Sequence, residues 1–159
     1  MSVDGNTKNS AKWYSLALFM LTGLFMFRVV AQLIQVWHPL GVLPSFETWQ
    51  SGALSYPILL MCQISILWAC LRIVWRMFKG TVVAVPKKGQ IFLYLGGLYL
   101  AVMAIRLTIG LTVASEHFWF GPVLPTIFHI VLATFMLVYG WYHASAAYPS
   151  KILHRGVNG

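Results

Sequence analysis

Acidic residues are nearly absent from this chain, and charge of either sign is scarce. Its 159 residues include three Asp or Glu and eleven Lys or Arg, so that 9% are charged whereas 59% are hydrophobic. Soluble domains carry about 25% charged residues, which excludes an ordinary soluble domain. The net charge of +8 does not indicate nucleic-acid binding, because the basic residues are spread over three connections that face anionic lipid headgroups. The composition predicts an integral membrane protein.

Cysteine is rare, and the motifs of common catalytic sites are missing. Cys62 and Cys70 fall in one apolar run, where a helix separates them by about 12 Å, too far for a disulfide. No CxxC or CxxCH is present, which removes the motif-level signals of thiol redox chemistry and c-type haem. There is no Gly-rich phosphate loop, and no Asp in the body of the chain to orient a histidine in a Ser-His-Asp triad. These absences favour a protein that is not an enzyme.

Long apolar runs are what the chain does have. They cover residues 13–36, 53–74, 91–114 and 123–144, and each is close to the ~20 residues that cross a bilayer core as a helix. The predicted fold class is an all-α, polytopic four-helix transmembrane bundle. Its membrane domain would occupy residues 13–147, between tails at residues 1–12 and 148–159.

The basic residues predict the orientation of this bundle. Nine of the eleven flank the apolar runs, and the connections 37–51 and 115–121 contain neither Lys nor Arg. Such a bias places the basic connections inside, so both termini and the middle connection are predicted to be cytoplasmic. The first run is too long for a signal-peptide core and is not followed by a cleavage motif. We therefore expect an uncleaved first helix, a form that favours the bacterial inner membrane.

An internal duplication is suggested by the positions of two arginines. Arg28 and Arg106 each lie fifteen residues after the start of an apolar run, and Val-Leu-Pro recurs at 42–44 and 123–125. This pattern predicts two parallel halves of two helices each, related by an axis along the membrane normal.

A stripe of small residues runs along the third helix. Gly97, Ala101, Ala104 and Thr108 share one helical face. Small residues let a neighbouring backbone approach closely, so this stripe is predicted to be a helix–helix contact.

Arg28 and Arg106 are also the main candidates for a functional site, because both lie inside apolar runs in the predicted outer half. A buried charge there costs at least a few kcal/mol, and arginine does not escape by losing its proton. Helical spacing and depth bring further polar residues to the same level. Bidentate guanidinium groups suit anionic or carbonyl-bearing ligands: a phospholipid head, a quinone, a carboxylate or a haem propionate. The predicted ligand-binding layer consists of Arg28, Gln32, Gln63, Arg106 and His129, with Gln35 on the same helical face.

Structural roles explain the same arginines equally well. The only acids outside the N-terminal segment are Glu47 and Glu116, one in each outer connection. Two structural ion pairs would form if these connections fold down on the bundle. Polar residues also serve as interhelical contacts, and arginines near a helix end extend toward the interface.

Histidine placement leaves a b-type haem open. His129 and His143 lie on one helical face of the fourth run, but bis-histidine ligation requires a histidine from a second helix, and the first three runs have none. His38 and His117 lie near helix ends and can approach His129. A single outer haem b, with an arginine at its propionates, therefore stays an alternative.

A metal site is the remaining chemical alternative. Imidazole and carboxylate groups are ligands of zinc and iron. No HExxH or comparable close spacing occurs. The candidate ligands are His38, His117, His129, Glu47 and Glu116.

Three classes of function follow from these residues. The first is a small accessory membrane protein that packs in a larger complex, or binds a lipid, a quinone or another anionic or carbonyl ligand in the outer layer. The second is a redox or metal-dependent membrane enzyme. The third is an oligomeric anion transporter or channel that uses Arg28 and Arg106. The expected partners are the lipid bilayer and other membrane subunits or further copies of the chain, and not nucleic acid.

Overall fold

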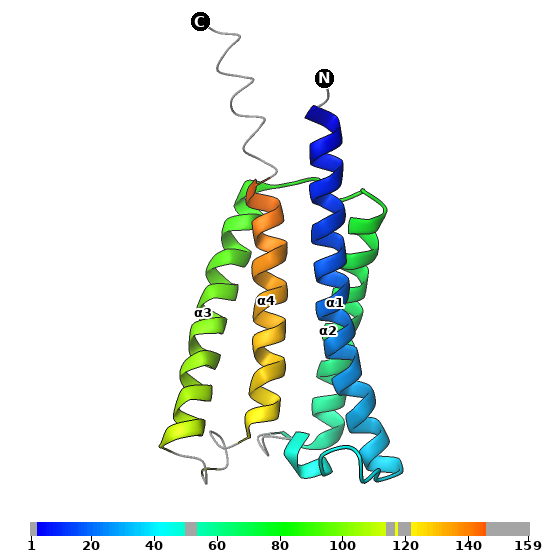
Figure 1. Ribbon diagram of the computed structural model, residues 1–159, viewed down its shortest axis with the longest axis vertical. Coiled ribbons are helices and arrows are strands. Elements are labelled where there is room, and N and C mark those ends of the chain that lie inside the picture. Colours follow the sequence, from blue (N-terminus) through cyan, green and yellow to red (C-terminus); the bar gives the residue numbers. More distant parts are fainter. Residues whose placement is uncertain (1–2, 50–53, 114–116, 118–121, 146–159) are drawn as a thin grey trace, which may run out of the picture.

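Four long helices and one short 3₁₀ helix make up the fold (Figure 1). The computed structural model describes residues 3–49, 54–113, 117 and 122–145, with side chains from residue 11 onward. Four helices are long and apolar enough to span a membrane. This confirms the four-helix, all-α multi-pass membrane fold that the sequence predicts. The elements are α1 (Val3–Trp37), η1 (Phe46–Trp49), α2 (Tyr56–Phe78), α3 (Pro86–Thr112) and α4 (Val123–Ser145).

Helix ends differ from the predicted ones mainly at the end of the bundle that carries the basic residues, called the basic end below. The helix α1 begins at Val3 rather than at residue 13, so most of the predicted N-terminal tail is helical. Similarly, α2 continues to Phe78, and α3 begins at Pro86, where proline suits the first helical turn. Helical backbone hydrogen bonds continue beyond the apolar runs. The prediction followed hydropathy, which drops where the apolar runs end. The predicted C-terminal tail lies outside the described residues.

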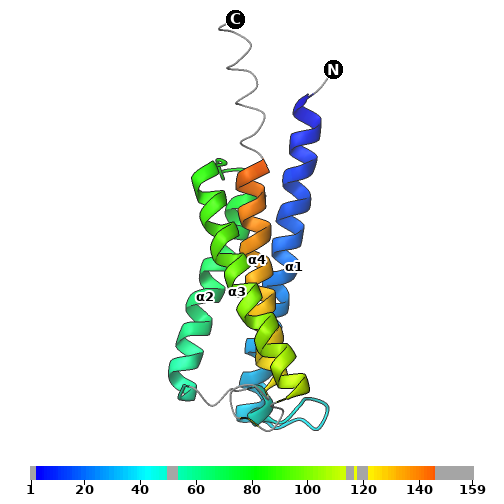
Figure 2. The ribbon, with the colours of Figure 1, turned by 90° about the vertical axis from the view of Figure 1, so that its left-hand side faces the viewer.

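The helices pack in the order α2, α1, α4, α3, as Figures 1 and 2 show together. The most extensive contact joins α3 to α4, and α1 packs against both α4 and α2. The two central helices are therefore more buried: 39% of the apolar spanning segment is buried in α1 and in α4, against 17% in α2 and 11% in α3. The predicted repeat relates α1 to α3 and α2 to α4. Its axis would therefore require an α2–α3 contact equivalent to the α1–α4 contact. The described residues contain no comparable contact, and the repeat stays a prediction.

Glycines allow α3 and α4 to approach closely, but not the ones that the sequence pointed to. A Cβ at Gly89 would lie 2.7 Å from the Ala144 backbone nitrogen, and one at Gly140 would lie 2.9 Å from that of Leu93. Gly97 has nothing within 4 Å of its Cβ position, and Ala101, Ala104 and Thr108 are exposed. The predicted stripe therefore points away from α4, and the true contact face is rotated from it.

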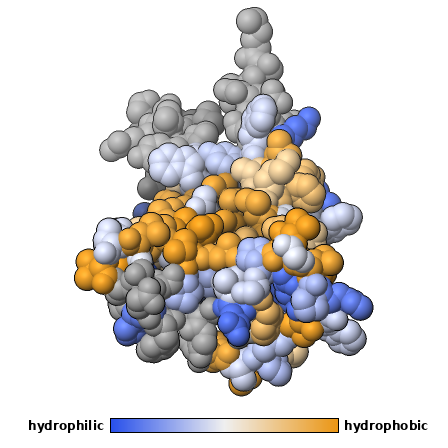
Figure 3. All heavy atoms as spheres, turned by 60° about the horizontal axis from the view of Figure 1, so that its bottom comes forward, coloured by the Kyte–Doolittle hydropathy of each residue, from blue (hydrophilic) through white to orange (hydrophobic). Residues whose placement is uncertain are grey.

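Two hydrophobic clusters hold the bundle together. One lies toward the basic end and centres on Leu18, Val74 and Tyr139. The other lies beneath η1 and contains Trp49 and Phe128. Outside these clusters large apolar side chains are widely exposed, and Figure 3 shows hydrophobic side chains spread in a broad band over the visible face. A lipid bilayer is the environment that suits such a surface.

Candidate functional site

The five residues of the predicted layer turn inward from all four long helices. Arg28 and Gln32 on α1, Gln63 on α2 and Arg106 on α3 are each 5% exposed or less. His129 on α4 is half-buried. Four of the five side chains are therefore buried within the bundle, and their role in ligand binding stays a prediction. We call the set, together with Tyr99 described below, the outer polar layer.

The Arg28 guanidinium is held beneath η1. Its Nη2 donates a hydrogen bond to the backbone carbonyl of Trp49 at 3.1 Å, and its Cζ lies 5.5 Å from the centre of the Phe128 ring. The Trp49 and Phe128 rings stack with their centroids 6.1 Å apart. Arg28 Nε is buried and has no hydrogen-bond partner among the described residues.

The predicted ion pair between Arg28 and Glu47 does not form within the described residues. Glu47 lies on η1 with an exposed side chain, and Arg28 binds the carbonyl two residues further along the same helix. A backbone carbonyl supplies an acceptor without burying a second charge, which would add its own desolvation penalty. Glu116 lies outside the described residues, so a pair between Arg106 and Glu116 stays a prediction.

One amide pair connects α1 to α2 within the layer. Gln63 Nε2 donates a hydrogen bond to Gln32 Oε1 at 3.0 Å. The other halves of both amides, Gln32 Nε2 and Gln63 Oε1, are buried and have no hydrogen-bond partner among the described residues. Flipping both amides exchanges these roles. Either way, one donor group and one acceptor remain unsatisfied.

Tyr99 also belongs to the layer, although no pattern in the sequence predicted it. Its hydroxyl shares a hydrogen bond with His129 Nδ1, with the two atoms 2.5 Å apart. Both Arg28 and Arg106 interact electrostatically with Tyr99 and with His129. Tyr99 and Arg106 are seven residues apart and so share a face of α3. That spacing was the available signal, but a tyrosine in an apolar run is more commonly an interfacial or lipid-facing residue.

Gln35 lies on the same face of α1 as Arg28, but its side chain hydrogen-bonds the connection between α1 and η1 instead. Its Nε2 donates to the carbonyls of Leu40, Leu43 and Pro44, and its Oε1 accepts the Leu40 amide at 2.9 Å. Trp49 Nε1 also donates to the Pro44 carbonyl at 3.0 Å. These bonds fix residues 38–49 over the end of the bundle.

The residues proposed for metal or haem binding do not assemble in the described part of the chain. His38, Glu47 and His117 are exposed, and His129 is bound to Tyr99. No three His, Cys, Asp or Glu side chains come together among the described residues, while Glu116 lies outside them. His129 and His143 are both on α4, and none of α1, α2 and α3 contains a histidine that would complete a bis-histidine site.

The chain matches no family model, no curated protein and no solved structure. Its function therefore rests on the geometry of the described residues.

The chemistry that the outer polar layer offers is hydrogen bonding to oxygen. Arg28 Nε and Gln32 Nε2 are donors one helical turn apart, and Gln63 Oε1 is an acceptor facing Gln32 across the α1–α2 contact. In a membrane interior an unsatisfied buried group costs several kcal/mol, because no water is present to replace its partner. The layer is thus equipped to recognise a group that accepts two hydrogen bonds and donates one.

Proposed function

We propose that this protein is a small, non-catalytic membrane protein that binds a lipid, a quinone or another ligand with carbonyl or anionic oxygens in its outer polar layer. The observation that carries the proposal is a set of buried groups without hydrogen-bond partners among the described residues: Arg28 Nε, and one donor and one acceptor of the Gln32–Gln63 amide pair. A carbonyl, carboxylate or phosphate oxygen satisfies both donors and also interacts with the arginine charge.

The arrangement around Arg28 supports a binding role more than a purely structural one. The Trp49 carbonyl accepts a hydrogen bond from Nη2 and the Phe128 ring lies against the guanidinium, whereas Nε is buried without a hydrogen-bond partner among the described residues. A side chain with only a structural role is expected to have its buried polar atoms paired. The apolar wall of Phe128 and Trp49 would contact the non-polar part of a ligand.

An accessory role in a larger assembly fits the helix arrangement. Because α2 and α3 are the least buried helices and present apolar side chains outward, they would contact lipid, another membrane subunit or a second copy of the chain. Following the basic residues, we place both termini on the cytoplasmic side of a bacterial inner membrane. A reporter enzyme fused after residue 159, active only in the cytoplasm, tests this orientation.

The ligand proposal is tested by titrating the detergent-solubilised protein with decylubiquinone and, separately, with lauric acid, and by counting bound molecules by native mass spectrometry. The wild type should bind one molecule of at least one probe. Gln32→Leu removes the amide, and Arg28→Lys keeps the charge but removes Nε–H. Both variants should bind at least tenfold more weakly, which is a loss of ~1.4 kcal/mol or more of binding free energy.

Gln90→Leu is the matched control for Gln32→Leu, because Gln90 is an exposed glutamine on α3. It should bind like the wild type. Unchanged affinity in Gln32→Leu and Arg28→Lys, with both variants folded, would refute the proposed site.

A further inference from the structure

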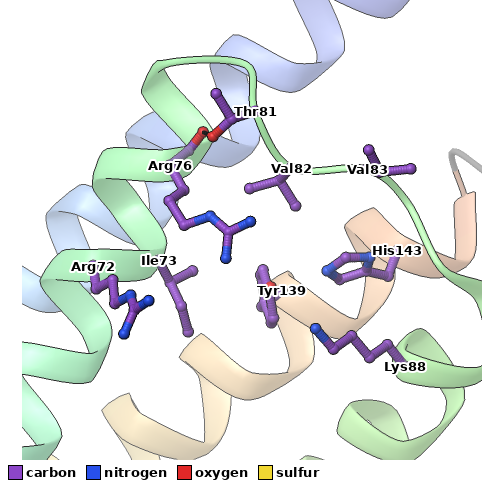
Figure 4. Close-up of a pocket in the computed structure, with 9 residues that line it drawn as sticks. All are labelled: Arg72, Ile73, Arg76, Thr81, Val82, Val83, Lys88, Tyr139 and His143. Carbon is purple, nitrogen blue, oxygen red and sulfur yellow. Dashed lines mark hydrogen bonds between the residues drawn. The ribbon is translucent and has the colours of Figure 1, made fainter.

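A second polar site lies at the basic end, far from the outer polar layer along the bundle. It is a recess of about 190 Å³ whose walls come from three helices and from the connection between α2 and α3. Figure 4 shows the lining side chains. Those that matter here are Arg72 and Arg76 of α2, Val82 of the connection, Lys88 of α3, and Tyr139 and His143 of α4.

The walls of this recess are fixed by hydrogen bonds. Gly80 turns the chain at the end of α2 with φ of 64°, a conformation that favours glycine. The Thr81 amide and hydroxyl then donate to the Arg76 carbonyl at 3.1 and 3.2 Å. The Tyr142 hydroxyl donates to the Val82 carbonyl at 3.1 Å. The connection is therefore attached to both α2 and α4, and the recess is a built feature of the fold.

His143 supplies a hydrogen-bond donor that nothing in the described protein uses. Its Nδ1 accepts the Val85 amide at 3.0 Å, so the ring proton is on Nε2. Nε2 is buried and has no hydrogen-bond partner among the described residues, and the side chain is 1% exposed. Tyr139 and Tyr142 pack edge-on against the ring with centroids 4.6 and 5.4 Å away, which holds its orientation. Because His143 lines the recess, this N–H is available to an acceptor there.

The charge of the recess is wholly positive. Arg72, Arg76 and Lys88 line it, and the described lining contains no acidic side chain. In Figure 4 the Arg76 guanidinium extends from α2 toward Tyr139, and the Lys88 side chain extends from α3 toward the same residue. Arg72 is positioned by the Trp68 ring, 5.4 Å from its Cζ. Three cations, with no acidic side chain in the described lining and beside a buried neutral donor, are complementary to an anion with several acceptor oxygens.

We propose that this recess binds a phosphate group, carried by an anionic phospholipid headgroup or free in solution. Arg76 and Lys88 neutralise its charge, and His143 Nε2–H donates to one of its oxygens. The recess lies where α2 ends and α3 begins. The neighbouring residues of α2 include the exposed apolar side chains Leu71 and Trp75. A headgroup bound there could leave its acyl chains on the lipid-facing side of the same helix, as basic pockets between membrane helices do with anionic lipids.

The test compares two double variants that remove the same charge from the same end of the protein. The recess variant, Arg76→Gln with Lys88→Gln, removes two cationic side chains from the lining of the recess. Lys79→Gln with Lys87→Gln removes two lysines that do not line it. All four side chains are exposed, so both variants should fold. Each is titrated in mild detergent with short-chain phosphatidylglycerol, with phosphatidylcholine of equal chain length, and with inorganic phosphate, and bound molecules are counted by native mass spectrometry.

The wild type should retain one phosphatidylglycerol more strongly than phosphatidylcholine. The recess variant should bind it at least tenfold more weakly than the control variant does, since two charge-assisted hydrogen bonds are lost at one site. Saturation by inorganic phosphate, lost in the recess variant alone, supports the same site and assigns it to soluble phosphate. Equal affinity in the two double variants, or no preference for phosphatidylglycerol or phosphate over phosphatidylcholine, would overturn the proposal.

Discussion

Arg28 and Trp49 are joined by a hydrogen bond from the arginine Nη2 to the tryptophan backbone carbonyl, 3.1 Å long. This contact explains how a permanent cation is accommodated in an apolar helix. The carbonyl comes from η1, which folds back over the bundle because Gln35 and Trp49 bind the chain between them. The outer connection therefore has a direct part in shaping the outer polar layer.

Trp49 is expected to stabilise this end of the bundle. Its side chain is 2% exposed and stacks on Phe128, so Trp49→Ala should lower the free energy of unfolding by about 3 kcal/mol. Trp37→Ala serves as the control, because Trp37 is 78% exposed. Reversible unfolding in mixed micelles measures both. A loss in Trp49→Ala no larger than in Trp37→Ala would show that η1 does not hold the layer together.

Gln35→Leu should loosen the outer connection without disturbing the helices. The substitution removes the acceptor of one backbone amide and the donor to three carbonyls, which should cost roughly 1–3 kcal/mol. Limited proteolysis should then cut between residues 38 and 45 faster than in the wild type. Gln90→Leu, at an exposed position of α3, should be cut at the wild-type rate, and equal rates in the two variants would contradict the assignment.

Two glycines of α3 should respond oppositely to the same substitution. Gly89→Ala places a methyl group against the α4 backbone and should destabilise the α3–α4 pair by about 1–3 kcal/mol. Gly97→Ala meets open space and should be neutral or stabilising by up to ~1 kcal/mol, because alanine favours a helix. Thermal unfolding of the two variants in one detergent decides the matter. The reverse order would mean that α3 presents its other face to α4.

Tyr99→Phe should weaken the outer polar layer by removing the hydroxyl that binds His129. Leaving His129 Nδ1 without its partner should cost about 1–3 kcal/mol of unfolding free energy. The same change should shift the His129 imidazole resonances in an NMR spectrum. Tyr94→Phe is the control, since Tyr94 is 79% exposed. Unchanged His129 resonances in Tyr99→Phe would refute the contact.

The sequence predicts the helices and the inward direction of the main polar residues, because both follow from the physics of a bilayer. Apolar runs of spanning length must be helical, and buried polar groups such as Gln32 and Gln63 avoid lipid by turning toward a neighbour. Their mutual hydrogen bond is a consequence of that constraint. The helix ends are less predictable, since hydropathy does not show that α1 continues to Val3.

Contacts that depend on three-dimensional placement could not be read from the chain. Arg28 had two acidic candidates in sequence, and its partner is a backbone carbonyl that only the path of η1 brings near. The stripe through Gly97 was the predicted contact face of α3, and this was wrong. Only the position of α4 shows that Gly96 lies at the contact, with its Cβ position 3.1 Å from Met136 Cβ. The recess at the basic end required the α2–α3 connection to fold back onto His143.

A native mass spectrum of the wild-type protein released from mild detergent, with no ligand added, tests the central claim most directly. The account predicts an extra mass of one lipid, quinone or similar oxygen-bearing molecule. That mass should persist in the Arg76→Gln, Lys88→Gln variant, which leaves the outer polar layer intact, and disappear in Gln32→Leu. A bare chain, or a retained molecule that Gln32→Leu keeps as firmly as the wild type, would contradict a ligand site in the outer polar layer.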